Sequence, residues 1–126
     1  MEARAKFWFD QVPQDLSTAR LLLRNRRYGF ALFTLHLALE KFLKGCIVES
    51  TGRVPPRTHD LVRLAEVASI VLPVEHGQAL ERLTRLALEA RYPTNLLRLT
   101  RTLALEAFAR GESALQWLQQ QRQSEA

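Results

Sequence analysis

Apolar residues recur along this chain at steps of three and four, with charged residues between them. This spacing is typical of helices that bury one face, because an α-helix completes a turn every 3.6 residues. The pattern predicts helices and no strand, over about 3–25, 28–50, 59–71, 74–89 and 95–121. Pro13 is expected either to kink the first helix or to mark its restart. Because short connections between long helices favour antiparallel neighbours, the predicted fold is all-α, an up-and-down bundle of four or five helices.

Turn-forming and capping residues mark the ends of these helices. The second helix is expected to end at Thr51-Gly52, because glycine readily adopts the left-handed conformation of a helix cap. Pro55-Pro56 cannot continue a helix, so residues 52–58 are predicted to form a loop. Thr58 is then the predicted N-cap of the third helix.

The segment 28–50 is apolar nearly all round and carries one polar stripe. A helix of this kind belongs at the centre of a bundle rather than on its surface. His36, Glu40 and Lys44 follow one another at steps of four residues, so they lie along one face of the helix. Charges at such a place must be paired, because an unpaired buried ion is strongly unfavourable. The stripe is therefore the first candidate site.

With 126 residues, 47% of them hydrophobic and 25% charged, the chain is expected to form one domain over 1–126, with a core of about 5–120. Its single cysteine, Cys46, cannot form an intramolecular disulfide. The three scattered histidines without a cysteine cluster indicate no metal site and no cofactor. The N-terminal residues lack the pattern of a signal peptide, and no charge-free stretch reaches the ~18 residues that a membrane span needs. We expect a cytoplasmic protein with no membrane partner.

The net charge is +5, and fifteen of the eighteen basic residues are arginines. Guanidinium groups bind phosphate with two parallel hydrogen bonds, so this balance is compatible with a nucleotide or RNA as partner. Arg98 and Arg101 lie on one face of the last predicted helix and extend such a basic surface. Other arginines have an acidic neighbour one turn away, as Arg110 has in Glu106, which is typical of a solvated helix face. Charge alone leaves both alternatives open.

Four short pieces of the sequence occur in an order that resembles a known family. They are Trp8 with Asp15 in the first helix, HLALEKFLKG at 36–45, PPRTHDL at 55–61 and ARYP at 90–93. Together they resemble the HEPN domain, an all-helical family whose name refers to higher eukaryotes, prokaryotes and nucleotide binding. The resemblance covers about residues 5–120 and implies a bundle of four or five helices that pairs as a homodimer.

The resemblance also implies a common prokaryotic arrangement, in which a small HEPN protein works with a separately encoded minimal nucleotidyltransferase. Such pairs often resemble a toxin and its antitoxin. Some HEPN members are metal-independent ribonucleases, and others are noncatalytic subunits that bind a substrate or nucleotide. This chain has no glycine-rich phosphate loop and no paired-carboxylate metal motif, so we expect neither nucleotidyltransferase nor ATPase activity from it alone.

The ribonuclease branch uses an arginine followed, after four to six residues, by a histidine. Such a pair needs no metal, because the histidine moves the 2′-hydroxyl proton while the arginine stabilises charge on the phosphate. Only Arg53 and His59 have this spacing here, and Val54 with Pro55-Pro56 departs from the family pattern. One such match is expected by chance, so we name no catalytic residue and keep this pair as weak candidates. In the alternative, His59 covers the helix end or bonds to Glu40 across the bundle.

Arg91 and Tyr92, at the break before the last helix, are placed to reach back toward the polar stripe. Arg91 can form a forked ion pair with Glu40. We hypothesise one polar pocket for a phosphate-bearing ligand, lined by Glu40, Lys44, His59, Arg91 and Tyr92. The alternative is a buried ion-pair network that only fixes the packing and the loops.

Three functions follow from these observations. The first is a homodimeric accessory subunit that binds a nucleotide or substrate and acts with a minimal nucleotidyltransferase, without catalysis of its own. The second is a ribonuclease toxin of the same fold, with His59 and either Arg53 or Arg91 in catalysis. The third is a noncatalytic dimeric scaffold for protein interaction. We favour the first.

Overall fold

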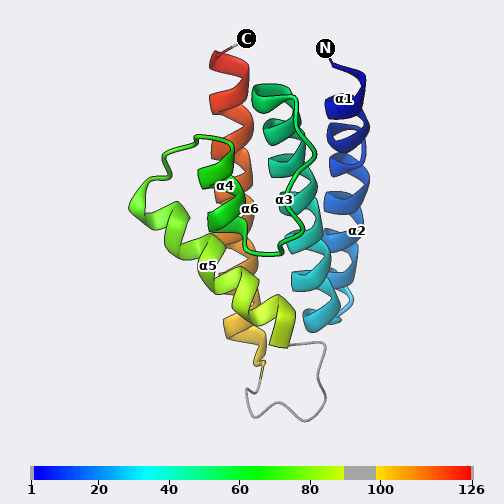
Figure 1. The fold of residues 1–126 in the computed structure, drawn as a ribbon. Helices are drawn as coiled ribbons and strands as arrows, with labels where there is room; N and C mark the ends of the chain where they lie inside the picture. Colours follow the sequence, from blue (N-terminus) through cyan, green and yellow to red (C-terminus); the bar gives the residue numbers. More distant parts are fainter. Residues whose placement is uncertain (1, 90–98, 126) are drawn as a thin grey trace.

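The computed structural model describes residues 2–89 and 99–125 (Figure 1). Its helices are α1 (Ala3–Phe9), α2 (Val12–Arg24), α3 (Tyr28–Thr51), α4 (Leu61–Val67), α5 (Val74–Glu89) and α6 (Arg101–Ser124). The described residues contain no strand, and the predicted all-α bundle is confirmed. In the described part of the chain, no helix is both long enough and apolar enough to cross a membrane.

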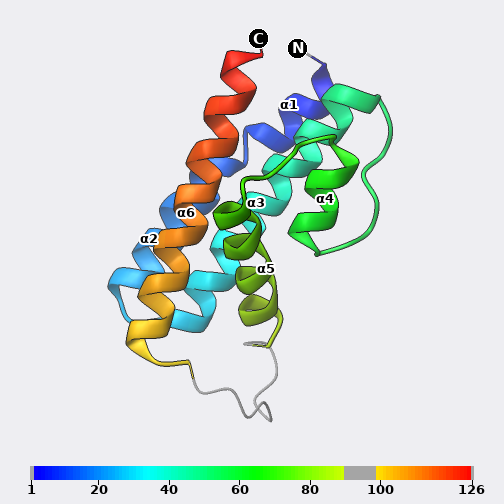
Figure 2. The ribbon, with the colours of Figure 1, turned by 90° about the vertical axis from the view of Figure 1, so that its left-hand side faces the viewer.

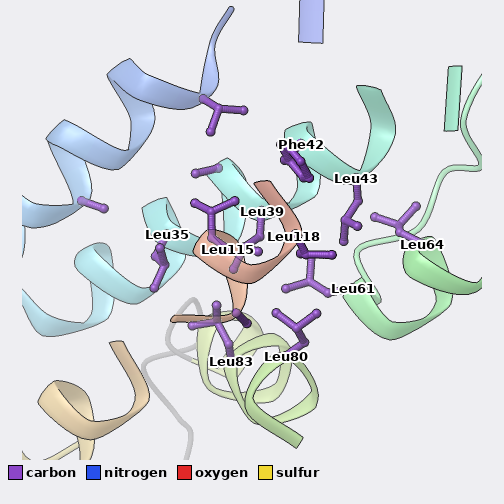
Figure 3. Close-up of a cluster of buried hydrophobic side chains, with 14 of the residues drawn as sticks. Leu35, Leu39, Phe42, Leu43, Leu61, Leu64, Leu80, Leu83, Leu115 and Leu118 are labelled. Atoms are coloured by element: carbon purple, nitrogen blue, oxygen red, sulfur yellow. The ribbon is translucent and has the colours of Figure 1, made fainter. Parts of the chain in front are cut away.

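The long helix α3 is the centre of the bundle, as its all-round hydrophobicity predicts. It contacts each of the other helices, and in Figure 1 it runs between α2 on one side and α5 and α6 on the other. Its leucines meet leucines of α4, α5 and α6 in one continuous core (Figure 3). The largest fully buried side chains that α3 contributes to this core are Leu32, Leu35, Leu39, Leu43 and Ile47.

The sequence predicted helix boundaries at Pro13 and at Gly52, and the structure shows the backbone at both. Pro13 marks a restart rather than a kink, because α1 ends at Phe9 and Pro13 lies in the first turn of α2. Proline is well tolerated there, since the N–H groups of a first turn have no partner within the helix. Gly52 follows the end of α3 in the left-handed conformation, with a φ of 68°, as predicted.

The predicted start of the third helix is wrong. Thr58 does not cap it; the N-cap is Asp60, whose side chain accepts a hydrogen bond from the first turn of α4. The Thr58 hydroxyl instead accepts a hydrogen bond from the Asp60 N–H at 3.1 Å. A polar side chain at either position can satisfy a free N–H group, so the sequence signal was ambiguous. The consequence is that His59 lies in the loop before α4 and not in the helix.

The remaining boundaries are a mixture of agreement and revision. Helix α5 spans Val74–Glu89 as predicted, whereas α4 ends at Val67, four residues earlier than expected. Helix α6 begins at Arg101, with Thr100 as its N-cap, and continues to Ser124. The predicted start of this helix at about residue 95 lies outside the described residues.

The turn between α2 and α3 contains a strained residue. Arg26 has a left-handed backbone with a φ of 61°, and its N–H bonds to the Leu23 carbonyl at 3.1 Å. Side chains with a Cβ atom are disfavoured in this conformation by about 1–2 kcal/mol, and glycine is not. We therefore expect Arg26→Gly to raise the free energy of unfolding in urea by about 0.5–1 kcal/mol. Arg85→Gly, at an exposed position inside α5, should instead lower it by about 1 kcal/mol. A loss of stability of equal size in both variants would contradict the prediction.

Candidate functional site

Glu40 is a buried acid in the middle of α3, with 6% of its surface exposed. Its Oε2 atom accepts a hydrogen bond from Lys44 Nζ at 3.0 Å, one helical turn further along. Its Oε1 atom accepts a hydrogen bond from His59 Nδ1 at 2.8 Å. Both carboxylate oxygens are thereby satisfied, as buried polar groups must be. The structure thus contains the ion pair that the stripe predicts and the contact between Glu40 and His59 that was one alternative for this histidine.

The loop 52–60 carries His59 to Glu40. It leaves the end of α3 and runs back along the bundle before α4 begins (Figure 1). His36, the first residue of the stripe, binds the end of this loop. Its buried ring donates a hydrogen bond from Nε2 to the His59 carbonyl oxygen at 2.8 Å. His59 is therefore fixed by its backbone as well as by its ring.

The electrostatic balance at Glu40 favours the ionised acid. Burial by itself raises the pKa of Glu40, because it removes water from the carboxylate. The hydrogen bonds from His59 and Lys44, together with their charges, outweigh burial and bring the pKa below its ordinary value of 4.5. An ionised carboxylate accepts hydrogen bonds only, so it requires a proton on His59 Nδ1.

His59 is the most exposed member of this cluster. Its side chain is 54% exposed, and its second ring nitrogen, Nε2, has no hydrogen-bond partner among the described residues. With Nδ1 held by Glu40, a neutral His59 offers Nε2 as an acceptor, and a protonated His59 offers Nε2–H as a donor to an anion. The arrangement is suited to bind a hydroxyl or phosphate group, or to exchange a proton with one.

Three further residues, Trp8, Lys41 and Asp15, lie near the cluster, and sequence reasoning assigned none of them to the site. Lys44 Nζ lies 5.6 Å from the centre of the Trp8 ring, where the ring attracts the ammonium group. Lys41, the residue after Glu40 in α3, forms an ion pair with Asp15 of α2, with Nζ and Oδ2 2.7 Å apart. The signal that could have found them was the occurrence of Trp8 and Asp15 in the same family resemblance as the stripe.

An apolar groove opens beside Trp8. Its volume is about 420 Å³, and it lies between α1, the last turns of α3 and the start of the following loop. Its lining residues are Ala3, Phe7, Trp8, Val48, Val54 and Pro55, with Arg4 as the one charged member. Because Val48 follows Lys44 by one helical turn, the groove adjoins the charged cluster.

The structure does not bring Arg53 and His59 together within one chain. The Arg53 N–H donates to Thr51 Oγ1 at 3.0 Å, so Arg53 lies beside the end of α3. His59 is bonded to Glu40, eleven residues before Thr51 in the same helix. At 1.5 Å per residue, these two points of α3 are about 16 Å apart. Arg91 and Tyr92, the other predicted members of the pocket, lie outside the described residues.

The next candidates are groups of metal-binding side chains and the thiol of Cys46. Among these residues, no group of three or more histidine, cysteine or acidic side chains is arranged to hold a metal ion. Cys46 is buried, and burial raises the pKa of its thiol to about 12. A thiol with such a pKa is protonated at neutral pH and is a poor nucleophile.

The fold and the cluster define a class, an all-helical domain that holds an acid, a histidine and a lysine together around its central helix. The family model described as the HEPN domain matches residues 5–121, and the chain belongs to the HEPN domain family.

Two solved structures share this fold. TT1696 from Thermus thermophilus is 24% identical, with a TM-score of 0.79 over 94% of this chain and 98% of that chain. ST0689, an archaeal HEPN homologue, is 23% identical, with a TM-score of 0.71 over 96% of this chain and 98% of that chain. No curated protein shows significant similarity.

Proposed function

We propose that this HEPN-domain protein is a noncatalytic nucleotide-binding subunit that acts as a homodimer with a separately encoded minimal nucleotidyltransferase, in a toxin–antitoxin-like arrangement. The observation that carries the proposal is the half-exposed His59, which Glu40 orients through Nδ1 and which presents Nε2 to solvent. Membership in the HEPN family supports the choice of partner, since such pairs are a common prokaryotic arrangement.

The surroundings of His59 support a nucleotide as the ligand. Lys44 has three N–H donors and uses one of them on Glu40, so two donors remain for a phosphate. The apolar groove beside Trp8 offers a nucleobase both a hydrophobic wall and an aromatic ring. In this arrangement the phosphates lie toward Lys44 and His59, and the base lies in the groove.

The position of Arg53 favours binding over catalysis. A metal-independent ribonuclease needs a cation at the phosphate while the histidine moves the proton. Arg53 lies about 16 Å along α3 from the point where His59 is bound, which exceeds the length of an arginine side chain. The ribonuclease alternative therefore lacks Arg53 within one chain, and its other arginine candidate, Arg91, lies outside the described residues.

Binding of a fluorescent ATP analogue tests the role of His59. We expect His59→Ala to weaken binding about tenfold, the effect of one lost charge-assisted hydrogen bond. His76→Ala is the matched control, because His76 contacts Trp117 on another side of the bundle, and it should change the affinity less than twofold. Equal affinities of His59→Ala and the unchanged protein, with both folded by circular dichroism, would refute the nucleotide site.

Co-expression with the minimal nucleotidyltransferase of a neighbouring gene tests the partner. A complex that survives gel filtration, with two copies of this chain, is the expected result. Cleavage of RNA by the purified chain, lost in His59→Ala, would replace the proposal with the ribonuclease alternative. A stable dimer that binds no nucleotide and cleaves no RNA would leave the scaffold as the function.

A further inference from the structure

A second polar surface lies at the end of the bundle where α2 turns into α3. The 24 residues from 16 to 39 contain four arginines and no acidic residue, although the chain as a whole has 13 acidic residues and a net charge of only +5. Arg20 is paired with Glu112 of α6. The other three, Arg24, Arg26 and Arg27, surround the turn.

These three arginines are free to contact a ligand. All three are exposed, and none of them has an acidic partner among the described residues. Helix α6 begins at the same end of the bundle, at the exposed Arg101, which also lacks such a partner (Figures 1 and 2). Elsewhere several exposed cations are neutralised locally, as Arg63 is by Glu66. Positive charge therefore accumulates at this end.

An exposed aromatic side chain follows Arg27 by three residues, about one helical turn. Phe30, in the first turn of α3, is 68% exposed, which is unusual for a phenylalanine. Leu21, one turn before the end of α2, is 52% exposed. Flat apolar surface next to unpaired guanidinium groups is the combination that single-stranded nucleic acids use, with phosphates on the cations and bases stacked on the ring.

The backbone conformation of Arg26 indicates that the stability of the fold does not require an arginine at this turn. Arg26 has a left-handed conformation that glycine adopts at lower free energy, and its side chain forms no hydrogen bond or ion pair with the described residues. A residue that strains the turn and gives nothing to the fold is a candidate for binding.

We propose that Arg24, Arg26, Arg27 and Phe30 form a binding surface for single-stranded nucleic acid, separate from the Glu40 cluster. Phe30 precedes Glu40 by ten residues, which is about 15 Å along α3. Arginine forms forked pairs with phosphate, and Phe30 adds a stacking surface that a lipid headgroup or an inorganic polyphosphate does not use. The surface does not depend on the nucleotide site proposed above.

Fluorescence anisotropy with a labelled oligouridylate tests the arginines. We expect Arg24→Gln/Arg27→Gln to weaken binding about tenfold and to reduce the slope of log K against log salt by about 1.4, since each phosphate contact on a single strand contributes about 0.7. Arg63→Gln/Arg85→Gln removes the same charge from another part of the surface and should leave the slope unchanged. Equal losses in the two double variants would overturn the proposal, because net charge alone would then explain binding.

Phe30→Ala and Arg26→Gly separate nucleic acid from other ligands and from misfolding. Phe30→Ala should weaken oligouridylate binding about fivefold or more and leave the binding of inorganic polyphosphate unchanged. Arg26→Gly should weaken oligouridylate binding while it raises stability, a combination that unfolding cannot produce. Three outcomes would overturn the proposal. All variants could bind polyphosphate and oligouridylate equally, or the arginines could be needed only for binding to anionic vesicles. Phe30→Ala could also change nothing but the oligomeric state.

Discussion

Replacing Glu40 with glutamine should lower the free energy of unfolding by about 2 kcal/mol. Glutamine has the same shape but no charge, and its amide keeps only one acceptor oxygen. Either Lys44 or His59 therefore loses its hydrogen-bond acceptor, and both lose the carboxylate charge. Breaking a fully buried ion pair costs about 3–5 kcal/mol. We expect less here, because the side chain of Lys44 is 15% exposed and that of His59 is 54% exposed, so water can partly replace the carboxylate.

Urea unfolding at several pH values checks this prediction. Because the pKa of Glu40 is lower in the folded state than its ordinary value of 4.5, the folded protein binds fewer protons at this site than the unfolded chain. Its stabilisation is therefore fully present above about pH 4.5 and is lost as the pH falls through the folded pKa. The difference between Glu40→Gln and the unchanged protein should be largest at neutral pH and shrink in acid.

The control is Glu106→Gln. Glu106 also has two cationic partners, Arg82 and Arg110, but its side chain is 44% exposed. Water screens such a pair, so this variant should lose less than about 0.5 kcal/mol at neutral pH. If the two variants were equally stable, or if the deficit of Glu40→Gln persisted in acid, the buried ion pair would not be the source of the stability.

Most of the fold follows from hydrophobic spacing, and the differences arise where two local signals compete. A helix that is apolar on nearly all sides must be covered by other helices, so the central position of α3 was predictable. Around Thr58 and Asp60, two side chains compete for the same free N–H groups, and the sequence does not show which one starts α4. Such a choice depends on how Leu61 and Leu64 of α4 reach the core, which is a tertiary effect.

Of the contacts in the candidate site, only the one between residues close in sequence was predictable. Glu40 and Lys44 face each other because they are one helical turn apart. The contact between Glu40 and His59 depends on the path of the loop 52–60, which sequence spacing does not determine; it was one of two alternatives for His59. Spacing alone suggested instead a pair of Arg53 and His59, and the same loop carries these residues apart.

Leu39→Ala should have the largest effect on stability, about 3 kcal/mol. Leu39 is completely buried in α3, immediately before Glu40, and packs where α3 meets α6 (Figure 3). Its truncation removes apolar surface from the core and leaves a cavity that the surrounding helices cannot easily fill, since each of them is held against α3. The expected fall in melting temperature is about 10 °C for a domain of this size.

Leu21→Ala is the matched control, because it makes the same chemical change on a side chain that is 52% exposed. It should cost less than about 1 kcal/mol, since most of that side chain already contacts water in the folded state. Urea unfolding with an unchanged m-value would show that Leu39→Ala alters stability and not the extent of unfolding. A loss below about 1 kcal/mol for Leu39→Ala would mean that the centre of packing is not α3, and the position of Glu40 would then lose its explanation.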